Sequence, residues 1–435
     1  MKSFYSPRAA VAVIIANMIG IGVFTSLGFQ LESITDGFPL LMLWVVGGIM
    51  ALCGAASYAE LGASMPRSGG EYNFLGRIYH PIAGFISGWV SATIGFAAPI
   101  AAVSMAFGIF TSKALPGMSD DWIKPLAVGL VLFVTFFHGR RHIESGGLQI
   151  TSTILKIVLI LIFCGAALIL APETQPMSFI PKASDFGTMT SSAFAVSLIY
   201  VSFSYTGWNA ATYIIGELET PQKDLPRILI FGTGFVMLMY VLLNFVFLKV
   251  APIQAMVGEE EIGYIAARAA FGDIGGQLTA GMLTLTLISS VSAMTLAGPR
   301  ALQVIGEDFP ALGALSKTNE DGVPYRAVYL QSAIAITFIL TSSFKFIMIF
   351  AGAMLAFNSL LAVLGVFILR FREPDLPRPY KTWGYPITPL VFLAITSFTL
   401  IYTVQKNPGE GLFGLAVIVA GAVFYGISKW FGKEL

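Results

Sequence analysis

The chain carries a succession of apolar stretches that are each long enough to cross a lipid bilayer, and this feature restricts its fold more than any other. A helix needs about 20 mainly apolar residues to cross the hydrocarbon core. Charged residues make up only 11% of the 435 positions, whereas a soluble domain carries about 25%. We therefore expect an all-α integral membrane protein that lies in a lipid bilayer.

About twelve membrane spans can be placed by length and hydrophobicity. The fourth and ninth are short, and residues 341–345 leave only a tight turn between the ninth and the tenth. The predicted spans are 8–33, 38–63, 81–111, 122–138, 147–171, 188–218, 226–250, 275–305, 325–342, 345–370, 387–405 and 409–431.

The lysines and arginines predict the orientation of these spans. Most of the basic residues lie on one side, whose loops include GRRH (139–142), RFREPDLPRPYK (370–381) and the tail KWFGKEL. The opposite side carries the acidic run 259–261, within a segment (251–271) that we expect to form a short amphipathic helix on the outer face, or else a solvated loop. Basic loops stay in the cytoplasm, so we expect both termini inside and a plasma (inner) membrane location.

Two spans are interrupted at corresponding positions of the two halves of the chain. The first reads NMIGIGVF (17–24), and the sixth reads FSYTGWN (203–209). Glycines alone would suit close helix packing, but paired interruptions are typical of inverted-repeat transporters with a midplane site. Unwound backbone there offers amides to a carboxylate and carbonyls to an ammonium group. For Asn17 we favour a structural role, either capping the half-helix or bonding a neighbouring span.

Lys156 is an ionisable residue deep inside the fifth span. It follows Glu144 by twelve residues, so a helix carries it roughly 18 Å inward at about 1.5 Å per residue. Such a residue indicates function, because its stem is too short to reach the membrane surface from there. It serves either as a permanent cation or as a group that gains and loses a proton during transport.

Several motifs resemble the amino acid–polyamine–organocation superfamily, and most closely a bacterial permease of its L-type amino acid transporter branch. GIGVF resembles the family's G-S-G-I-F, and FSYTGWN resembles F-A-Y-G-G-W-N. The resemblance extends to three further segments: YAELGASMPRSGGEYNFLGRIY (58–79), GELETPQKDLPRIL (216–229) and AGPRAL (297–302). It implies a LeuT-type fold of five plus five inverted spans with discontinuous first and sixth helices. The repeats would be 1–171 and 188–370, followed by two peripheral helices within 387–435.

The resemblance also implies which groups hold the substrate. Its carboxylate would meet the amides of Gly20, Ile21 and Gly22. Its ammonium would meet carbonyls at the ends of the two half-helices, contributed by Met18, Ile19, Phe203 and Ser204. Because the family often has serine where this chain has Ile21, backbone contacts would survive here, but a hydroxyl contact would not.

Other residues take their implied roles from the same match. Phe203 would close over the substrate from outside, and Asn209 would either bind the substrate or brace the unwound backbone. Thr206 replaces a usual glycine, which suggests small or medium substrate side chains, while Tyr205 and Trp208 are structural. Lys156 would occupy the place of a sodium ion in sodium-coupled relatives, facing hydroxyls drawn from Ser289, Ser290 and Ser292.

We therefore expect a sodium-independent secondary transporter of neutral L-amino acids that works by alternating access, as an exchanger or a proton symporter. A polyamine or cationic amino acid carrier would need carboxylates near the unwound segments, which carry none. A non-transporting amino acid receptor is a further alternative, whereas an enzyme or a channel lacks the residues it would need. We expect no cofactor, no metal at His80, His138 or His142, and no nucleic-acid partner. The sequence gives no indication of a partner subunit.

Overall fold

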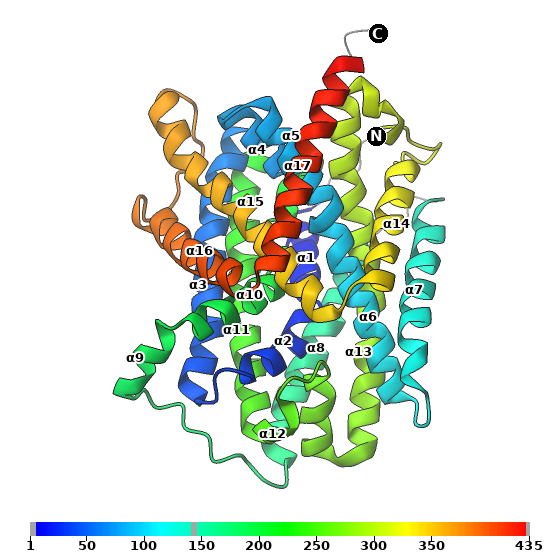
Figure 1. Ribbon diagram of the computed structural model, residues 1–435, viewed down its shortest axis with the longest axis vertical. Helices are drawn as coiled ribbons and strands as arrows, with labels where there is room; N and C mark the ends of the chain where they lie inside the picture. The colour runs from blue at the N-terminus through cyan, green and yellow to red at the C-terminus, as the bar shows by residue number, and fades with distance from the viewer. Residues whose placement is uncertain (1–5, 141–145, 432–435) are drawn as a thin grey trace.

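The computed structural model describes residues 6–140 and 146–431, which are helical over most of their length and contain no β-strand (Figure 1). The elements, in chain order, are α1 Pro7–Met18, α2 Gly22–Leu31, α3 Gly37–Ser64, α4 Glu71–Ile78, α5 Pro81–Val90, η1 Ser91–Phe96, α6 Ala97–Ala114, η2 Asp120–Trp122, α7 Ile123–His138, α8 Gly146–Leu170, α9 Ala183–Met189, α10 Ser192–Ser204, η3 Ala210–Glu217, α11 Pro221–Val250, α12 Ile253–Met256, α13 Ile262–Asp308, η4 Pro310–Leu315, α14 Tyr325–Thr341, α15 Phe344–Arg372, α16 Ile387–Lys406 and α17 Pro408–Phe431.

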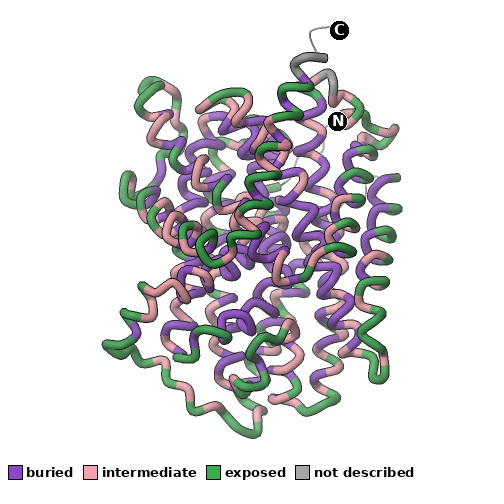
Figure 2. Tube along the Cα trace, in the orientation of Figure 1, coloured by how far each residue is buried: buried purple, intermediate pink, exposed green. Residues whose placement is uncertain are grey.

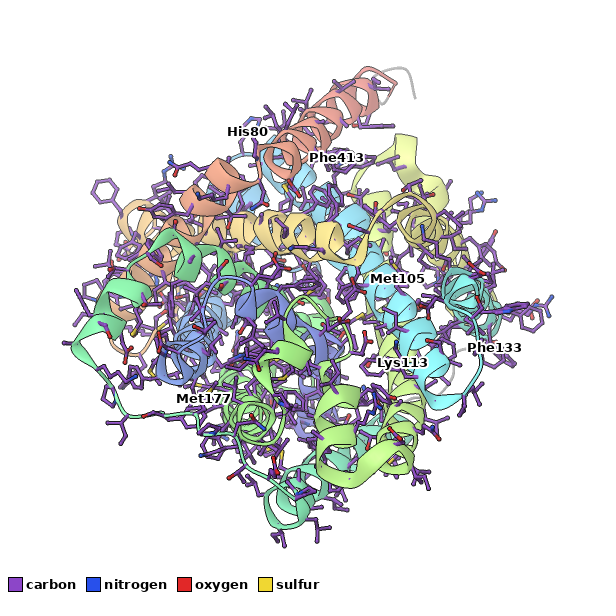
Figure 3. The ribbon with its side chains drawn as sticks, turned by 60° about the horizontal axis from the view of Figure 1, so that its bottom comes forward. His80, Met105, Lys113, Phe133, Met177 and Phe413 are labelled. Carbon is purple, nitrogen blue, oxygen red and sulfur yellow. The ribbon has the colours of Figure 1, made fainter. Side chains whose placement is uncertain are left out.

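The helices confirm a multi-pass membrane protein. Within the described residues, ten helices are long and apolar enough to cross a membrane, and the bent pair α9 and α10 makes an eleventh. The shorter apolar helix α14 matches the short ninth span. Large apolar side chains such as Phe133 and Ile162 are 57% and 61% exposed on the outside, and Figure 3 shows Phe133 pointing away from the bundle. Such exposed apolar surface suits lipid.

The long helices pack into two groups. In the first group α3 lies along α11, with α1, α2 and α10 beside them. In the second group α6 lies along α13, with α7 and α14 beside them, while α8 and α15 contact both groups. Figure 2 shows the buried residues concentrated toward the middle of the molecule and the exposed residues toward its periphery.

Both predicted interruptions are present. The chain leaves the helical conformation at 19–21, between α1 and α2, and again at 205–209, between α10 and η3. A third irregularity was not expected from the sequence: the π-helical turn η1 joins α5 to α6 within one span. Turns of this kind are frequent at functional sites.

The segment predicted as a short amphipathic helix is helical only in part. It contains the four-residue α12 and the first turns of α13, which begins at Ile262 and continues to Asp308. The two parts of α13 meet at a kink where Gly272 has a φ of +74°. The short helix is therefore joined to the following span, because glycine adopts this left-handed conformation without steric cost.

The loop after α12 is clamped onto α2. The Gly258 amide donates to the Gly28 carbonyl over 2.9 Å, and a Cβ on Gly28 would lie 2.1 Å from the Glu259 carbonyl oxygen. Nearby, the Lys345 ammonium contacts both carboxylate oxygens of Glu32 at 2.7 and 2.9 Å, joining the ends of α2 and α15. Helix α12, helix α2 and the first turns of α13 therefore pack together at one end of the bundle.

Glu260, in this loop, should make the stability of the folded protein depend on pH. Burial, together with the adjacent Glu261 and Glu259, raises the pKa of Glu260 from the usual 4.5 to about 7. The folded protein then binds this proton more tightly than the unfolded chain does. The stability from this group is fully present below about pH 4.5 and is lost as the pH rises through about 7. The unfolding temperature of the wild type should fall as the pH rises through this range, and that of Glu260→Gln should fall less. Parallel curves would contradict this assignment.

Candidate functional site

The two interrupted segments pack directly against each other. A Cβ on Gly22 would lie 2.7 Å from the Cα of Ser204. At the other end of the contact, Gly207 has a φ of +98°, and its Cβ would lie 2.9 Å from the Cβ of Asn17. The Asn17 amide donates to the Val13 carbonyl of its own helix at 2.8 Å and so does not cap α1 through that group. Gly22 of the first interruption faces Ser204, and Gly207 of the second faces Asn17. At both glycines the opposite segment lies too close for a side chain to fit.

The backbone at Gly20 leaves ordinary van der Waals space beside the first interruption. Helix α2 begins at Gly22, and the first amides of a helix have no carbonyl partner within that helix and carry its partial positive charge. The nearest atoms to a Cβ on Gly20 would be the Met18 carbonyl oxygen at 3.9 Å and Val103 Cγ2 at 4.0 Å. The Gly20 amide itself donates to Met18 over 2.7 Å. The start of α2, with the Ile21 and Gly22 amides, is therefore suited to an anionic group.

The carbonyl side is occupied by a residue that the sequence reasoning missed. The Tyr240 hydroxyl on α11 hydrogen-bonds to the Met18 carbonyl and, at 3.0 Å, to the Ser204 carbonyl. The Phe203 carbonyl accepts from the Thr206 hydroxyl at 2.6 Å. These carbonyls of the expected ammonium site thus have internal partners in this conformation. A phenol at mid-span, in FVMLMYVLLNF (235–245), was the available signal, because a buried hydroxyl needs a partner.

Removing this hydroxyl should weaken the contact between the interruptions. Tyr240→Phe removes the donor that the Met18 and Ser204 carbonyls share and leaves the Met18 carbonyl with the Gly20 amide alone, at a cost of about 1–3 kcal/mol. We expect amino acid uptake into liposomes to fall by roughly tenfold, since about 1.4 kcal/mol corresponds to a factor of ten. Tyr402→Phe, on a tyrosine whose ring packs against Phe398 on α16, is the matched control. Equal uptake by both variants would exclude Tyr240 from the site.

Lys156 reaches the first interruption from α8. Its side chain is buried, and its ammonium donates to the Ser290 hydroxyl at 2.7 Å and to the Ile19 carbonyl at 3.5 Å. The neighbouring serines bond elsewhere: Ser289 donates to the Thr286 carbonyl, and Ser292 pairs with the His138 ring at 2.7 Å. The structure thus brings one of the three predicted hydroxyls to Lys156. Glu144, from which the depth of Lys156 was inferred, lies outside the described residues.

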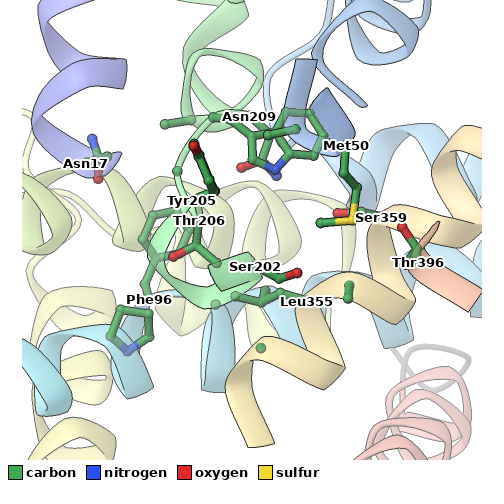
Figure 4. Close-up of a pocket in the computed structure, with 18 of the residues that line it drawn as sticks. Asn17, Met50, Phe96, Ser202, Tyr205, Thr206, Asn209, Leu355, Ser359 and Thr396 are labelled. Atoms are coloured by element: carbon green, nitrogen blue, oxygen red, sulfur yellow. The ribbon is translucent and has the colours of Figure 1, made fainter. Parts of the chain in front are cut away.

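Two cavities adjoin the interruptions. The first, of about 70 Å³, lies against the second interruption (Figure 4). Its lining comes from α1, α3, η1, α6, α10, the unwound segment, η3, α13, α15 and α16, and includes Asn17, Met50, Phe96, Thr206, Asn209 and Ser359. The second, of about 240 Å³, is mainly apolar and is lined by Gly20, Phe24 and Lys156 together with residues of α11 and α13. The second interruption and Asn17 therefore lie beside the smaller cavity, and Gly20 lies beside the larger one.

The side chains of the second interruption are anchored on its neighbours. The Tyr205 hydroxyl donates to the Trp44 carbonyl at 2.9 Å, and the Trp208 ring packs edge-on against Tyr58, with centroids 4.7 Å apart. Both partners belong to α3. Phe203 is only 4% exposed and is packed within the core in this conformation.

Asn209 reveals a carboxylate that the sequence did not place at the site. Its side-chain amide donates to the Glu71 carboxylate at 2.6 Å. The expectation that no carboxylate lies near the unwound segments is therefore wrong, because the fold brings one there from elsewhere in the chain. Glu71 belongs to α4 and is brought there by the fold, 138 positions from Asn209 in sequence. Its oxygens accept hydrogen bonds from three internal donors, two at Oε1 and one at Oε2.

Within the described residues, no three His, Cys, Asp or Glu side chains are gathered as they would be around a metal ion. The imidazole of His138 is engaged with Ser292, and His142 lies outside the described residues. The chemistry available at the interruptions consists of backbone dipoles, hydroxyls, the amides of Asn17 and Asn209, the Glu71 carboxylate and the Lys156 ammonium.

Comparison with known proteins identifies the family of this chain. Residues 5–423 match the family described as amino acid permease. The serine/threonine exchanger SteT of Bacillus subtilis is 28% identical, with 97% of this chain and 95% of that protein covered. The b(0,+)-type amino acid transporter 1 of Mus musculus is 26% identical, over 96% of this chain and 86% of that protein. The large neutral amino acids transporter small subunit 2 of Mus musculus is 25% identical, over 96% and 79%.

These relatives are amino acid transporters rather than enzymes. The family match extends over nearly the whole chain and includes both interruptions and Lys156. The chain therefore belongs to the amino acid permease family, within the amino acid–polyamine–organocation superfamily of membrane transporters.

Proposed function

We propose that the protein exchanges neutral L-amino acids across the plasma membrane without sodium, by alternating access. The observation that carries this proposal is the buried Lys156 ammonium, bonded to Ile19 at the first interruption and to Ser290 on α13. A fixed cation there makes a sodium ion unnecessary, because it supplies positive charge to the same carbonyl and hydroxyl groups. Exchange is favoured because the relative SteT is named as an exchanger.

The substrate class follows from the groups at the interruptions. The start of α2 offers amides to a carboxylate, and the carbonyls of Met18, Ile19, Phe203 and Ser204 would receive the ammonium once the internal bonds loosen. No side chain of 17–24 or 203–209 is charged, and the Glu71 carboxylate is already satisfied. Thr206 adds volume beside the cavity. We infer a preference for neutral amino acids with small or medium side chains.

Alternating access would use the two helix groups. Repeats 1–171 and 188–370 would each contribute one interrupted helix, and the peripheral helices α16 and α17 would follow them. The first group would rock against the second, with α8 and α15 following the motion and Phe203 closing over the substrate. The basic loops support placing both termini in the cytoplasm.

Uptake into liposomes tests the proposal. The purified protein is reconstituted, and uptake of labelled L-serine, L-alanine or L-leucine is measured with sodium or choline outside. We expect equal rates in both salts and uptake only into vesicles preloaded with a neutral amino acid. Excess lysine or putrescine should not compete.

Other outcomes would contradict parts of the proposal. Strict dependence on sodium would remove Lys156 from the role of the fixed cation. Uptake into empty vesicles that accelerates with an inward proton gradient would replace exchange with proton symport. Competition by lysine or putrescine would favour a carrier of cationic substrates, and specific binding without uptake would favour a receptor.

A further inference from the structure

Glu71 is a buried carboxylate held by hydrogen bonds alone. It is 2% exposed and begins α4. Its Oε1 accepts from the Tyr58 hydroxyl at 2.9 Å and the Asn209 amide at 2.6 Å, and its Oε2 accepts from the Tyr213 hydroxyl. It forms no ion pair with any described residue. A carboxylate can be buried only where hydrogen-bond donors of the protein replace its contacts with water. The three donors around Glu71 therefore form a specific structural cluster.

The backbone before Glu71 brings it onto η3, the second half of the interrupted helix. Gly69 and Gly70 have φ angles of +113° and +54°, which favour glycine. The Gly70 amide donates to Thr212 at 3.3 Å, and a Cβ on Gly70 would lie 2.9 Å from the Tyr213 ring. Two residues before Gly70, the Ser68 hydroxyl accepts from the backbone amide of Gly216 at 2.9 Å. The loop therefore contacts η3 at Thr212, Tyr213 and Gly216.

Two of the three donors to Glu71 line the smaller cavity. Asn209 and Tyr213 both belong to its wall, and Figure 4 shows Asn209 beside it. Glu71 itself is not among the lining residues and lies behind them. The third donor, Tyr58, belongs to α3, so the carboxylate joins the wall of the cavity to the first helix group.

We propose that Glu71 is a positioning residue that holds η3 against the cavity, and that it acts as a hydrogen-bond acceptor rather than as a charge. The inference rests on the proposed transport function. It predicts that transport depends on where Asn209 and Tyr213 are held, and that an uncharged side chain with the right acceptor suffices.

Glutamine can meet this requirement in one orientation. Its oxygen would replace Oε1 and accept from Tyr58 and Asn209, and its amide nitrogen would replace Oε2 and donate to Tyr213. The Tyr213 hydroxyl would then turn its hydrogen to the Ser91 hydroxyl, which already lies 3.2 Å away. Ser91 opens the π-helical turn η1. Because a hydroxyl both donates and accepts, the Tyr213 hydroxyl and the glutamine oxygen both keep partners in this arrangement.

The test is a double-mutant cycle on Glu71→Gln and Ser91→Ala, read as uptake into liposomes relative to the wild type. Each single variant should keep uptake within roughly threefold of wild type, because Tyr213 retains one acceptor in each case. The double variant should lose at least about tenfold beyond the product of the single effects, because the Tyr213 hydroxyl then faces the glutamine amide without an acceptor. The loss should appear mainly as a raised KM.

Glu71→Ala should abolish uptake, and the cycle keeps the proposal testable should that variant fold poorly. Tyr79→Phe provides the matched control, since the Tyr79 hydroxyl bonds the Leu361 carbonyl instead. Combined with Glu71→Gln, it should be additive. Single effects that simply multiply in the Glu71 and Ser91 double variant would overturn the proposal. So would a Glu71→Gln variant that is inactive on its own, since charge would then be required. Failure of wild-type uptake would instead count against the proposed function.

Discussion

Replacing Lys156 by alanine should abolish uptake at every sodium concentration while the protein still folds. The ammonium is the only basic side chain bonded to either interruption among the described residues, and it links the Ile19 carbonyl to Ser290 on α13. Alanine removes both bonds and leaves the carbonyl and hydroxyl facing the apolar cavity of about 240 Å³. We expect a fall in uptake of at least about 100-fold, since several kcal/mol of buried polar contacts are lost together.

The control and the graded variant make this test specific. Ser290→Ala removes one of the two partners and should give an intermediate loss of roughly tenfold. Lys124→Ala changes a lysine whose exposed side chain bonds the Leu340 carbonyl and should transport like the wild type. Gel filtration and thermal unfolding establish that each variant is folded. Wild-type uptake by Lys156→Ala would exclude it from the coupling role.

Two separate alanine substitutions in the first interruption, at Gly22 and at Gly20, should differ in their effect on uptake. The new Cβ of Gly22→Ala would lie 2.7 Å from the Cα of Ser204, where the neighbouring atom is backbone and cannot rotate away. The two interrupted segments must then separate, and we expect uptake to fall by at least roughly tenfold, because strain from overpacking typically costs about 1–3 kcal/mol. Leucine at position 22 should abolish uptake completely.

Gly20→Ala is the matched control for this backbone contact. Its Cβ would meet nothing closer than 3.9 Å, so the variant should fold like the wild type and unfold at the same temperature. Any change it causes should appear in KM, because the methyl group enters space beside the expected carboxylate site. Ser204→Gly should not rescue Gly22→Ala, since the clashing Cα remains. Equal loss in the two alanine variants would show that packing between the interruptions does not limit transport.

The sequence could predict those parts of the site that depend on local composition. The spans follow from runs of apolar residues, and the interruptions follow from glycines and polar residues placed where hydrocarbon does not tolerate them. The depth of Lys156 follows from the rise of a helix. All three are properties of neighbouring residues and need no knowledge of how the helices pack.

The partners of these residues could not be predicted, because they depend on which helix faces which. Ser289, Ser290 and Ser292 point in different directions, since each helical residue turns the next by about 100°. Only packing decides that Ser290 meets Lys156. Tyr240 reaches a carbonyl 222 positions away, and Glu71 meets an amide 138 positions away at Asn209.

The π-helical turn η1 changes the direction in which the side chains of the following helix α6 point relative to those of α5. Such a turn contains one residue more than an α-helical turn, so side chains after it are rotated by about 100° relative to an unbroken helix. Phe96, at the end of the turn, and Pro99, in α6, reach the smaller cavity from this rotated part. Deleting a single residue within 91–96 would restore a regular helix and swing both side chains off the cavity, although every apolar residue of the span would remain.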